Sequence, residues 1–132
     1  SAPDPAADST AAAPSLLDRR ALDAIRELSP DRGATILARV IDSYLVSAPD
    51  QLEALRRALV EKDAKTLQTQ AHSLKSSSAN VGARDLSELA REVEAFGRAG
   101  QTTEAAGLVE RMAAAFLRVR DALVVERERG VT

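Results

Sequence analysis

The chain has 132 residues, of which 45% are hydrophobic and only 2% aromatic, and its 18 basic and 20 acidic residues give a net charge of −2. This length is typical of one domain, whose core must be built from aliphatic side chains. Nucleic-acid binding is disfavoured, because a basic stripe and aromatic rings for stacking are both missing. The absence of cysteine excludes disulfides and thiolate metal sites. No apolar run approaches the roughly 18 residues of a membrane span, so we expect no membrane insertion of this segment.

The beginning of the chain has the composition of a linker. Residues 1–14 are Ala, Pro, Ser, Asp and Thr, with no large apolar side chain to anchor them. They also lack the basic start and apolar centre of a signal peptide. We therefore expect a flexible linker over residues 1–14, followed by a helical domain over residues 15–126.

The first part of that domain has a helical period. The apolar spacing predicts a short helix over residues 17–28, which Ser29 and Pro30 stop. Asp31 is expected to cap a second helix, and Pro49 must break or kink that helix.

Three further helices follow by the same criteria. Asp63 is expected to cap a helix that contains His72 and ends near residues 80–82, where Gly82 can supply a left-handed turn. Apolar repeats over residues 86–96 and 105–123 predict two more helices. The charged run that starts at Glu126 is interpreted as a solvated end, with residues 127–132 as a frayed tail. The fold class is therefore all-α, an antiparallel four-helix bundle with a short extra N-terminal helix.

The register of the helix with His72 predicts which of its sides faces the core. With about 100° per residue and Leu67 at zero, Ala71, Leu74, Ser78 and Val81 fall within about 40° of it and form the buried stripe. His72 falls near 140° and Ser76 near 180°, while Lys75 lies near 80° at the edge of the stripe. The outward face therefore carries the following side chains: Gln68, His72, Lys75, Ser76 and Ala79.

His72 is the only histidine, and it is the residue on which the prediction of function depends. An exposed imidazole beside a cation can accept a phosphoryl group, yet a single exposed histidine is ordinarily only a surface residue. A metal site is disfavoured, because no other His or Cys accompanies it. A serine hydrolase is also disfavoured, since no acid that could orient the imidazole is evident nearby.

The run from His72 to Ala83, His-Ser-Leu-Lys-Ser-Ser-Ser-Ala-Asn-Val-Gly-Ala, resembles the signature of histidine-containing phosphotransfer (HPt) domains. The family pattern is His-x-Leu-Lys-Gly-Ser-Ser/Ala-x-x-x-Gly-x. The likeness extends to the order of helices over residues 16–125. Gly97 and Arg98 also resemble a Gly-Arg pair that some members place near the phosphorylation site. The chain departs from the pattern at Ser76, where the family usually has glycine, and this departure bears on how closely a partner can dock.

The resemblance implies a phosphorelay intermediate. His72 would accept a phosphoryl group from the aspartate of one response-regulator receiver domain and pass it to another, and Lys75 would stabilise the phosphoryl charge. Gln68, Ser76, Ala79 and Arg98 would contact the receiver. No cofactor is expected in this domain, and Mg²⁺ is expected on the receiver. No Gly-rich nucleotide loop is present, so ATP is not the direct donor, and whether the domain counts as an enzyme in its own right stays open.

The resemblance leaves the context of the domain open. The composition of residues 1–14 favours the C-terminal HPt domain of a bacterial hybrid sensor histidine kinase, which would be cytoplasmic and tethered to the inner membrane through the rest of the kinase. The alternatives are a stand-alone HPt protein and a non-catalytic helical adaptor bundle. The signal, the cognate receivers and the oligomeric state are not predicted.

Overall fold

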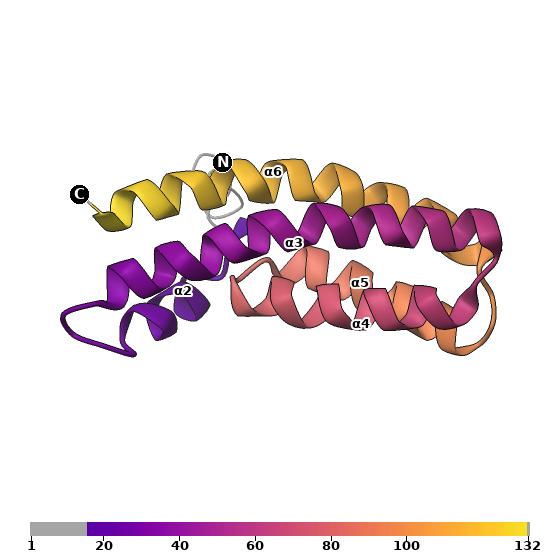
Figure 1. The fold of residues 1–132 in the computed structure, drawn as a ribbon, viewed down its shortest axis with the longest axis horizontal. Helices are drawn as coiled ribbons and strands as arrows, with labels where there is room; N and C mark the ends of the chain where they lie inside the picture. The colour runs from indigo at the N-terminus through magenta and orange to yellow at the C-terminus, as the bar shows by residue number, and fades with distance from the viewer. Residues whose placement is uncertain (1–15, 132) are drawn as a thin grey trace, which may run out of the picture.

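The computed structural model describes residues 16–131 and contains only helices there (Figure 1). The elements are α2 (Arg19–Arg26), α3 (Gly33–Glu61), α4 (Ala64–Asn80), α5 (Arg84–Arg98), a short 3-10 helix η2 (Thr103–Ala105) and α6 (Ala106–Val131). The expected all-α fold with a short N-terminal helix is confirmed. The expected linker over residues 1–14 lies outside the described residues. None of the helices in the described part combines the length and apolar character that a bilayer crossing needs.

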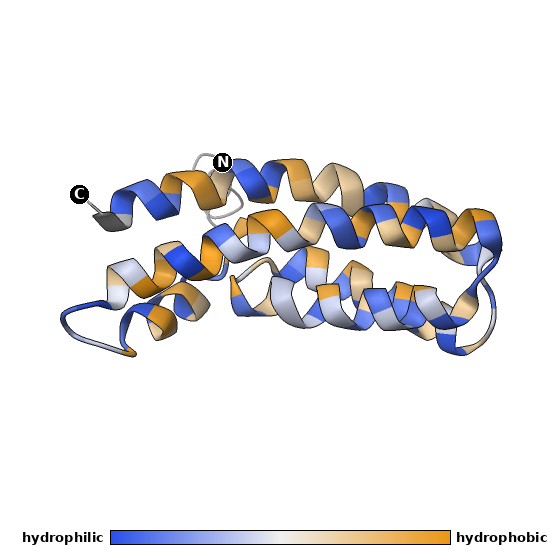
Figure 2. Ribbon diagram, in the orientation of Figure 1, coloured by the Kyte–Doolittle hydropathy of each residue, from blue (hydrophilic) through white to orange (hydrophobic). Residues whose placement is uncertain are grey.

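Helices α3, α4, α5 and α6 form the bundle, in which α3 and α5 each pack against both α4 and α6. The longest helices are α3 with 29 residues and α6 with 26 residues, and they lie side by side beyond the end of the shorter α4 and α5 (Figure 1). Helix α2 packs against this projecting part of α3. Helices that alternate direction with short connections bury one stripe each, and Figure 2 shows that hydrophobic and hydrophilic residues alternate around each helix.

The core is aliphatic, as the composition requires. Its largest fully buried side chains include Leu22, Leu37, Ile41, Leu55, Leu67, Leu74, Leu86, Met112 and Leu123. Tyr44 of α3 is a buried polar exception, and its hydroxyl lies 2.8 Å from the hydroxyl of Ser78 on α4. Burial raises the pKa of Tyr44 to about 12, so the phenol stays neutral and hydrogen-bonded. This bond explains why a serine occupies the buried stripe of α4.

Helix α3 lacks the break expected at Pro49, and it does not begin with the expected cap. Helix α3 runs through Pro49 without a break. Leucines on both sides of Pro49 are buried in the same core, and their burial outweighs the roughly 3 kcal/mol that a proline costs inside a helix. Asp31 is not the cap of this helix, which begins at Gly33 after Arg32. A side chain at position 33 would meet the backbone oxygen of Arg26 at 1.9 Å, so the tight α2–α3 turn determines where the helix begins.

The C-terminal run is helical rather than frayed, which corrects the expectation for residues 127–132 as far as Val131. Glu126 is only 4% exposed, and its carboxylate accepts hydrogen bonds from Arg19 and Arg26 of α2. Arg129 lies 3.5 Å from the same carboxylate, and Arg127 pairs with Asp42 of α3 at 2.6 Å. These charges on distant helices hold the end of α6 in place, and a single sequence segment cannot reveal such partners.

Helix α2 is also attached to the turn that ends α4. The amide of Asp18 donates to the carbonyl of Gly82 at 2.6 Å. Gly82 has φ +81°, and a Cβ there would lie 2.7 Å from the backbone oxygen of Asp18. Glycine is therefore required at position 82 both for the left-handed turn and for the close approach of α2.

Replacing Glu126 with Gln should destabilise the domain by about 1–2 kcal/mol, because three arginines lose a buried counter-charge that solvent only partly replaces. Hydrogen bonding by Arg19, opposed by burial and assisted by Arg26, lowers the pKa of Glu126 from its usual 4.5. The folded pKa lies below the unfolded one, so the advantage of Glu over Gln is complete above pH 4.5 and shrinks as the pH falls below it.

Urea unfolding of both proteins at several pH values measures this difference. Glu128→Gln is the matched control, since Glu128 lies on the same helix with its side chain 70% exposed. Equal losses in the two variants, or a difference that does not change with pH, would contradict the assigned role of Glu126.

Candidate functional site

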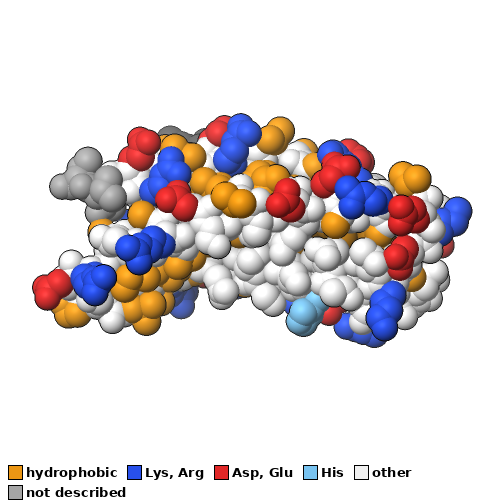
Figure 3. All heavy atoms as spheres, in the orientation of Figure 1, with side chains coloured by type: hydrophobic (Ala, Val, Ile, Leu, Met, Phe, Trp, Pro, Cys, Tyr) orange, Lys and Arg blue, Asp and Glu red, His pale blue; other side chains and the backbone are white. Residues whose placement is uncertain are grey.

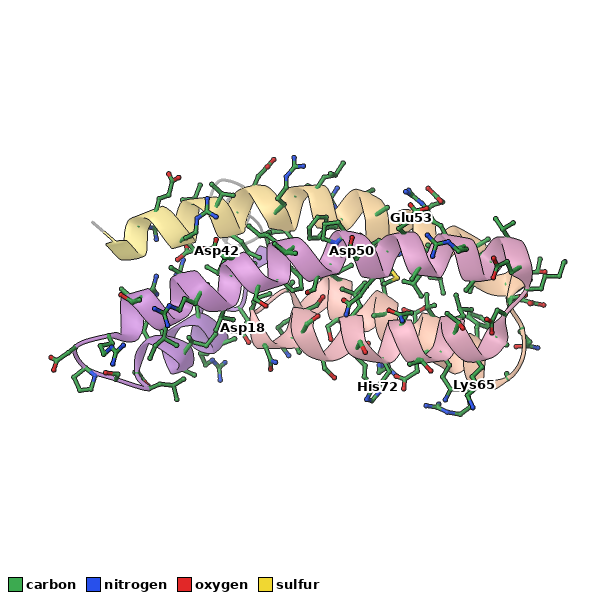
Figure 4. All side chains as sticks on the ribbon, viewed as in Figure 1. Asp18, Asp42, Asp50, Glu53, Lys65 and His72 are labelled. Atoms are coloured by element: carbon green, nitrogen blue, oxygen red, sulfur yellow. The ribbon has the colours of Figure 1, made fainter. Side chains whose placement is uncertain are left out.

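Helix α4 presents His72 to solvent. The helix begins where the carboxylate of Asp63 accepts the amide of Thr66 at 3.0 Å and its hydroxyl at 2.7 Å, as the predicted cap requires. The bonds from Thr66 lower the pKa of Asp63 and so keep the cap charged. The buried stripe of α4 has the predicted register, and the side chain of His72 is 60% exposed. Figure 4 shows its ring pointing away from α3, and Figure 3 shows it at the lower edge of the molecule, with atoms of charged side chains beside it.

A buried glutamate of α5 lies beside His72. Glu94 Oε2 is 2.8 Å from His72 Nδ1, and Glu94 Oε1 accepts from Lys75 Nζ at 2.7 Å. Arg98 Nη2, one turn further along α5, donates to Oε2 at 3.3 Å. The side chain of Glu94 is only 7% exposed, so these three partners replace most of the water that a carboxylate needs.

The contact with Glu94 determines the tautomer of the imidazole. A carboxylate can only accept, so Nδ1 carries the proton and Nε2 carries the free lone pair. No protein group in residues 16–131 makes a hydrogen bond to Nε2. An exposed imidazole with a fixed Nδ1–H and a free Nε2 is a nucleophile with a defined direction of attack.

The charge of Glu94 is stabilised by its neighbours. Hydrogen bonding by Lys75 lowers the pKa of Glu94 and His72 lowers it further, while burial acts in the opposite direction. The net shift is downward, so Glu94 is a carboxylate at neutral pH. Lys75 is 29% exposed and keeps two of its three N–H donors for another anion.

The other predicted contact residues surround His72 at different depths. Ser76 and Ala79 are exposed on α4, and Gln68 is half-buried one turn before His72. The side chain of Arg98 is 62% exposed and reaches the site through Glu94. The structure therefore brings Lys75 and Arg98 together with His72 through a carboxylate that the sequence analysis did not identify.

The expectation that no acid orients His72 is wrong, because Glu94 does so. A signal for it was present in the sequence. Counting outward from Gly82, His72 comes ten residues before the turn and Glu94 twelve residues after it. In an antiparallel helix pair with a short turn, residues at nearly equal distances from the turn lie opposite each other.

The arrangement lacks the other parts of a hydrolase. In the described part of the chain no serine hydroxyl is hydrogen-bonded to His72. The hydroxyl of Ser77 donates to the carbonyl of Leu74 and that of Ser87 to the carbonyl of Lys75, while Ser78 pairs with Tyr44. Within residues 16–131 there is also no group of three or more His, Cys, Asp or Glu side chains that could hold a metal ion.

Comparison with known proteins agrees with this geometry. The family model "Hpt domain" matches residues 39–122, which include all of α4 and α5. The structure is similar to the crystal structure of histidine-containing phosphotransfer protein B (HptB) from Pseudomonas aeruginosa PAO1, with a TM-score of 0.77 and 32% sequence identity over 86% of this chain and 96% of that chain. No curated protein sequence matched. The chain therefore belongs to the Hpt domain family and serves as a histidine phosphotransfer domain in two-component signalling.

Proposed function

We propose that His72 is the phosphoryl acceptor, that Nε2 is the reacting atom, and that the donors and acceptors are aspartates of response-regulator receiver domains. The observation that carries this proposal is the 2.8 Å contact between Nδ1 of the exposed His72 and the buried carboxylate of Glu94. HPt domains pass phosphoryl groups to receiver domains, and this contact leaves the opposite nitrogen available to one.

The proposed transfer uses groups with defined roles. The lone pair of His72 Nε2 attacks the phosphorus of the receiver's aspartyl phosphate, the N–P bond forms, and the acyl-phosphate P–O bond breaks with its electron pair on the aspartate carboxylate. The ring then carries a positive charge, which the carboxylate of Glu94 beside Nδ1 compensates. Lys75 offers its free N–H donors to the phosphoryl oxygens. The reverse sequence, with a second receiver, discharges His72. The Mg²⁺ that assists these steps is expected on the receiver.

The proposed docking surface is the outward face of α4 around His72. Ser76 and Ala79 are small and exposed, so a receiver can approach the ring closely. Beside them, a shallow groove between α3 and α4 is lined in part by Ser43, Ser77 and Asn80. Gln68 and Arg98 bound the other side of the proposed surface.

The context within a larger protein is a separate part of the proposal. The linker-like composition of residues 1–14 supports attachment to other domains, as at the C-terminal end of a hybrid sensor kinase on the cytoplasmic side of the membrane. A stand-alone phosphotransfer protein is the alternative.

His72→Gln should abolish phosphoryl uptake from a phosphorylated receiver and leave the helical circular dichroism and the thermal midpoint nearly unchanged, because an exposed site contributes little to packing. The phosphoryl label on the unmodified domain should be lost in acid and survive in base, because phosphohistidine is acid-labile and fairly stable to base. Acid-labile label on the His72→Gln protein would refute the assignment.

Lys75→Ala should slow transfer by roughly 10- to 100-fold, which corresponds to the loss of a charge-assisted contact worth about 1.5–3 kcal/mol. The measurement is a rapid-quench time course with a phosphorylated receiver. Lys65→Ala is the matched control, since Lys65 is exposed on the same side of α4, as Figure 4 shows. If both variants transfer at the rate of the unmodified domain, Lys75 is only a partner of Glu94.

Ser76→Arg and Ser76→Glu should both keep the fold and block receiver binding, because a long side chain there separates atoms that must approach to about 3–3.5 Å. Ser76→Gly should transfer normally, with a loss of up to about 1 kcal/mol of stability. Glu53→Arg places a similar bulk on the opposite side of the bundle (Figure 4) and serves as the control. Receiver binding to each variant is measured by titration, with NMR shifts as the readout. Normal binding by both bulky Ser76 variants would place the docking surface elsewhere.

A further inference from the structure

Helices α4 and α5 are in close contact one turn away from the histidine site, and a glycine makes this contact possible. Gly97 is buried inside α5, where its conformation is helical and needs no left-handed turn. A Cβ at this position would lie 2.7 Å from the backbone nitrogen of Gln68 on α4 and 2.9 Å from its Cα. These are backbone atoms, so no rotation of a side chain can relieve the contact.

We propose that Gly97 is a positioning residue for phosphotransfer: by allowing α5 to contact the backbone of α4, it brings the Glu94 carboxylate to Nδ1 of His72. This inference rests on the proposed function of His72 and adds a residue that touches neither the imidazole nor the phosphoryl group.

The two contacts occupy successive turns of the same helix pair. Gly97 faces Gln68, and one turn away on each helix Glu94 faces His72. Three residues along a helix correspond to about 4.5 Å, so a change of spacing at Gly97 is transmitted to Glu94 almost undiminished. A methyl group at position 97 must move the helices apart by roughly 0.7 Å to reach an ordinary contact of 3.4 Å.

A displacement of that size matters for the carboxylate. The Glu94 Oε2 to His72 Nδ1 distance is 2.8 Å, and an increase of about 0.7 Å takes it to the limit of a hydrogen bond. The helix itself would gain from alanine, because glycine is the less favourable helix former. The presence of glycine in the middle of α5 is therefore explained by the distance between the helices and not by local helix stability.

The chain offers a matched control. Gly107 lies in the first turn of α6, and a Cβ built there has no neighbour within 4 Å. Gly107→Ala and Gly97→Ala make the same chemical change in a helix, but only the second alters the spacing of α4 and α5.

The test reads the imidazole directly. His72 is the only histidine, so ¹⁵N NMR of the full chain reports one tautomer without overlap. We expect the Nδ1–H form to dominate in the unmodified domain and in Gly107→Ala. Gly97→Ala should shift His72 toward the Nε2–H form and slow transfer from a phosphorylated receiver by about 10- to 100-fold. Glu94→Asp withdraws the carboxylate without touching the helix crossing, and it should reproduce both effects.

If both changes act on the same contact, the double variant Gly97→Ala with Glu94→Asp should transfer phosphoryl only slightly more slowly than either single variant. A folded Gly97→Ala protein with the unmodified tautomer and rate would overturn the proposal. Gly107→Ala replaces a helical glycine without a clash, so it also provides a more stable background for Gly97→Ala. If Gly97→Ala fails to fold even in that background, Gly97 is needed for the packing of the fold, and the proposal is overturned as well. Since the tautomer is measured without a receiver, a failure of the unmodified domain to take up phosphoryl would count against the proposed function and not against the role of Gly97.

Discussion

The site depends on one buried carboxylate. Glu94 is 7% exposed, and a charge so far removed from water is stable only when donors take the place of the lost solvent. Two of those donors, His72 and Lys75, belong to α4, and the third, Arg98, belongs to the same helix as Glu94. The helices must therefore be close enough for an interhelical hydrogen bond, and that requirement links the fold of the pair to the chemistry of the imidazole.

A second buried carboxylate, between α6 and α2, shows what distinguishes a structural cluster from the proposed reactive one. Glu126 joins α6 to α2 with arginine partners, whose charge does not change over the physiological pH range. Glu94 joins α5 to α4 with a histidine among its partners, and the histidine keeps one nitrogen free. Both carboxylates have pKa values below the usual range, so both stay charged. The difference in function comes from the partners and from their exposure, not from the acid itself.

Local patterns predicted what depends on one helix at a time. The rotation of α4 placed His72 outside and Leu67, Leu74 and Ser78 inside, and the cap at Asp63 is where the sequence placed it. The helix break expected at Pro49 and the frayed C-terminal run are both absent because of contacts between distant segments, which propensity cannot represent. Glu94 was missed for the same reason, because it is adjacent to His72 only once α4 and α5 are paired. The distances of the two residues from the turn at Gly82 would have indicated that they lie opposite each other.

A relay intermediate must release its phosphoryl group as readily as it accepts it, and the site is consistent with that requirement. Tight binding of the phosphoryl group by the domain would stabilise the phosphorylated form and slow its transfer to the next receiver. In this structure Glu94 meets the ring at Nδ1, while the opposite side, where the phosphoryl group is proposed to bind, is open to solvent apart from the partly exposed Lys75. The protein thus fixes the orientation of the imidazole, and under the proposed function it leaves most of the phosphoryl stabilisation to the partner. An arrangement that orients the nucleophile without holding its cargo suits transfer in both directions.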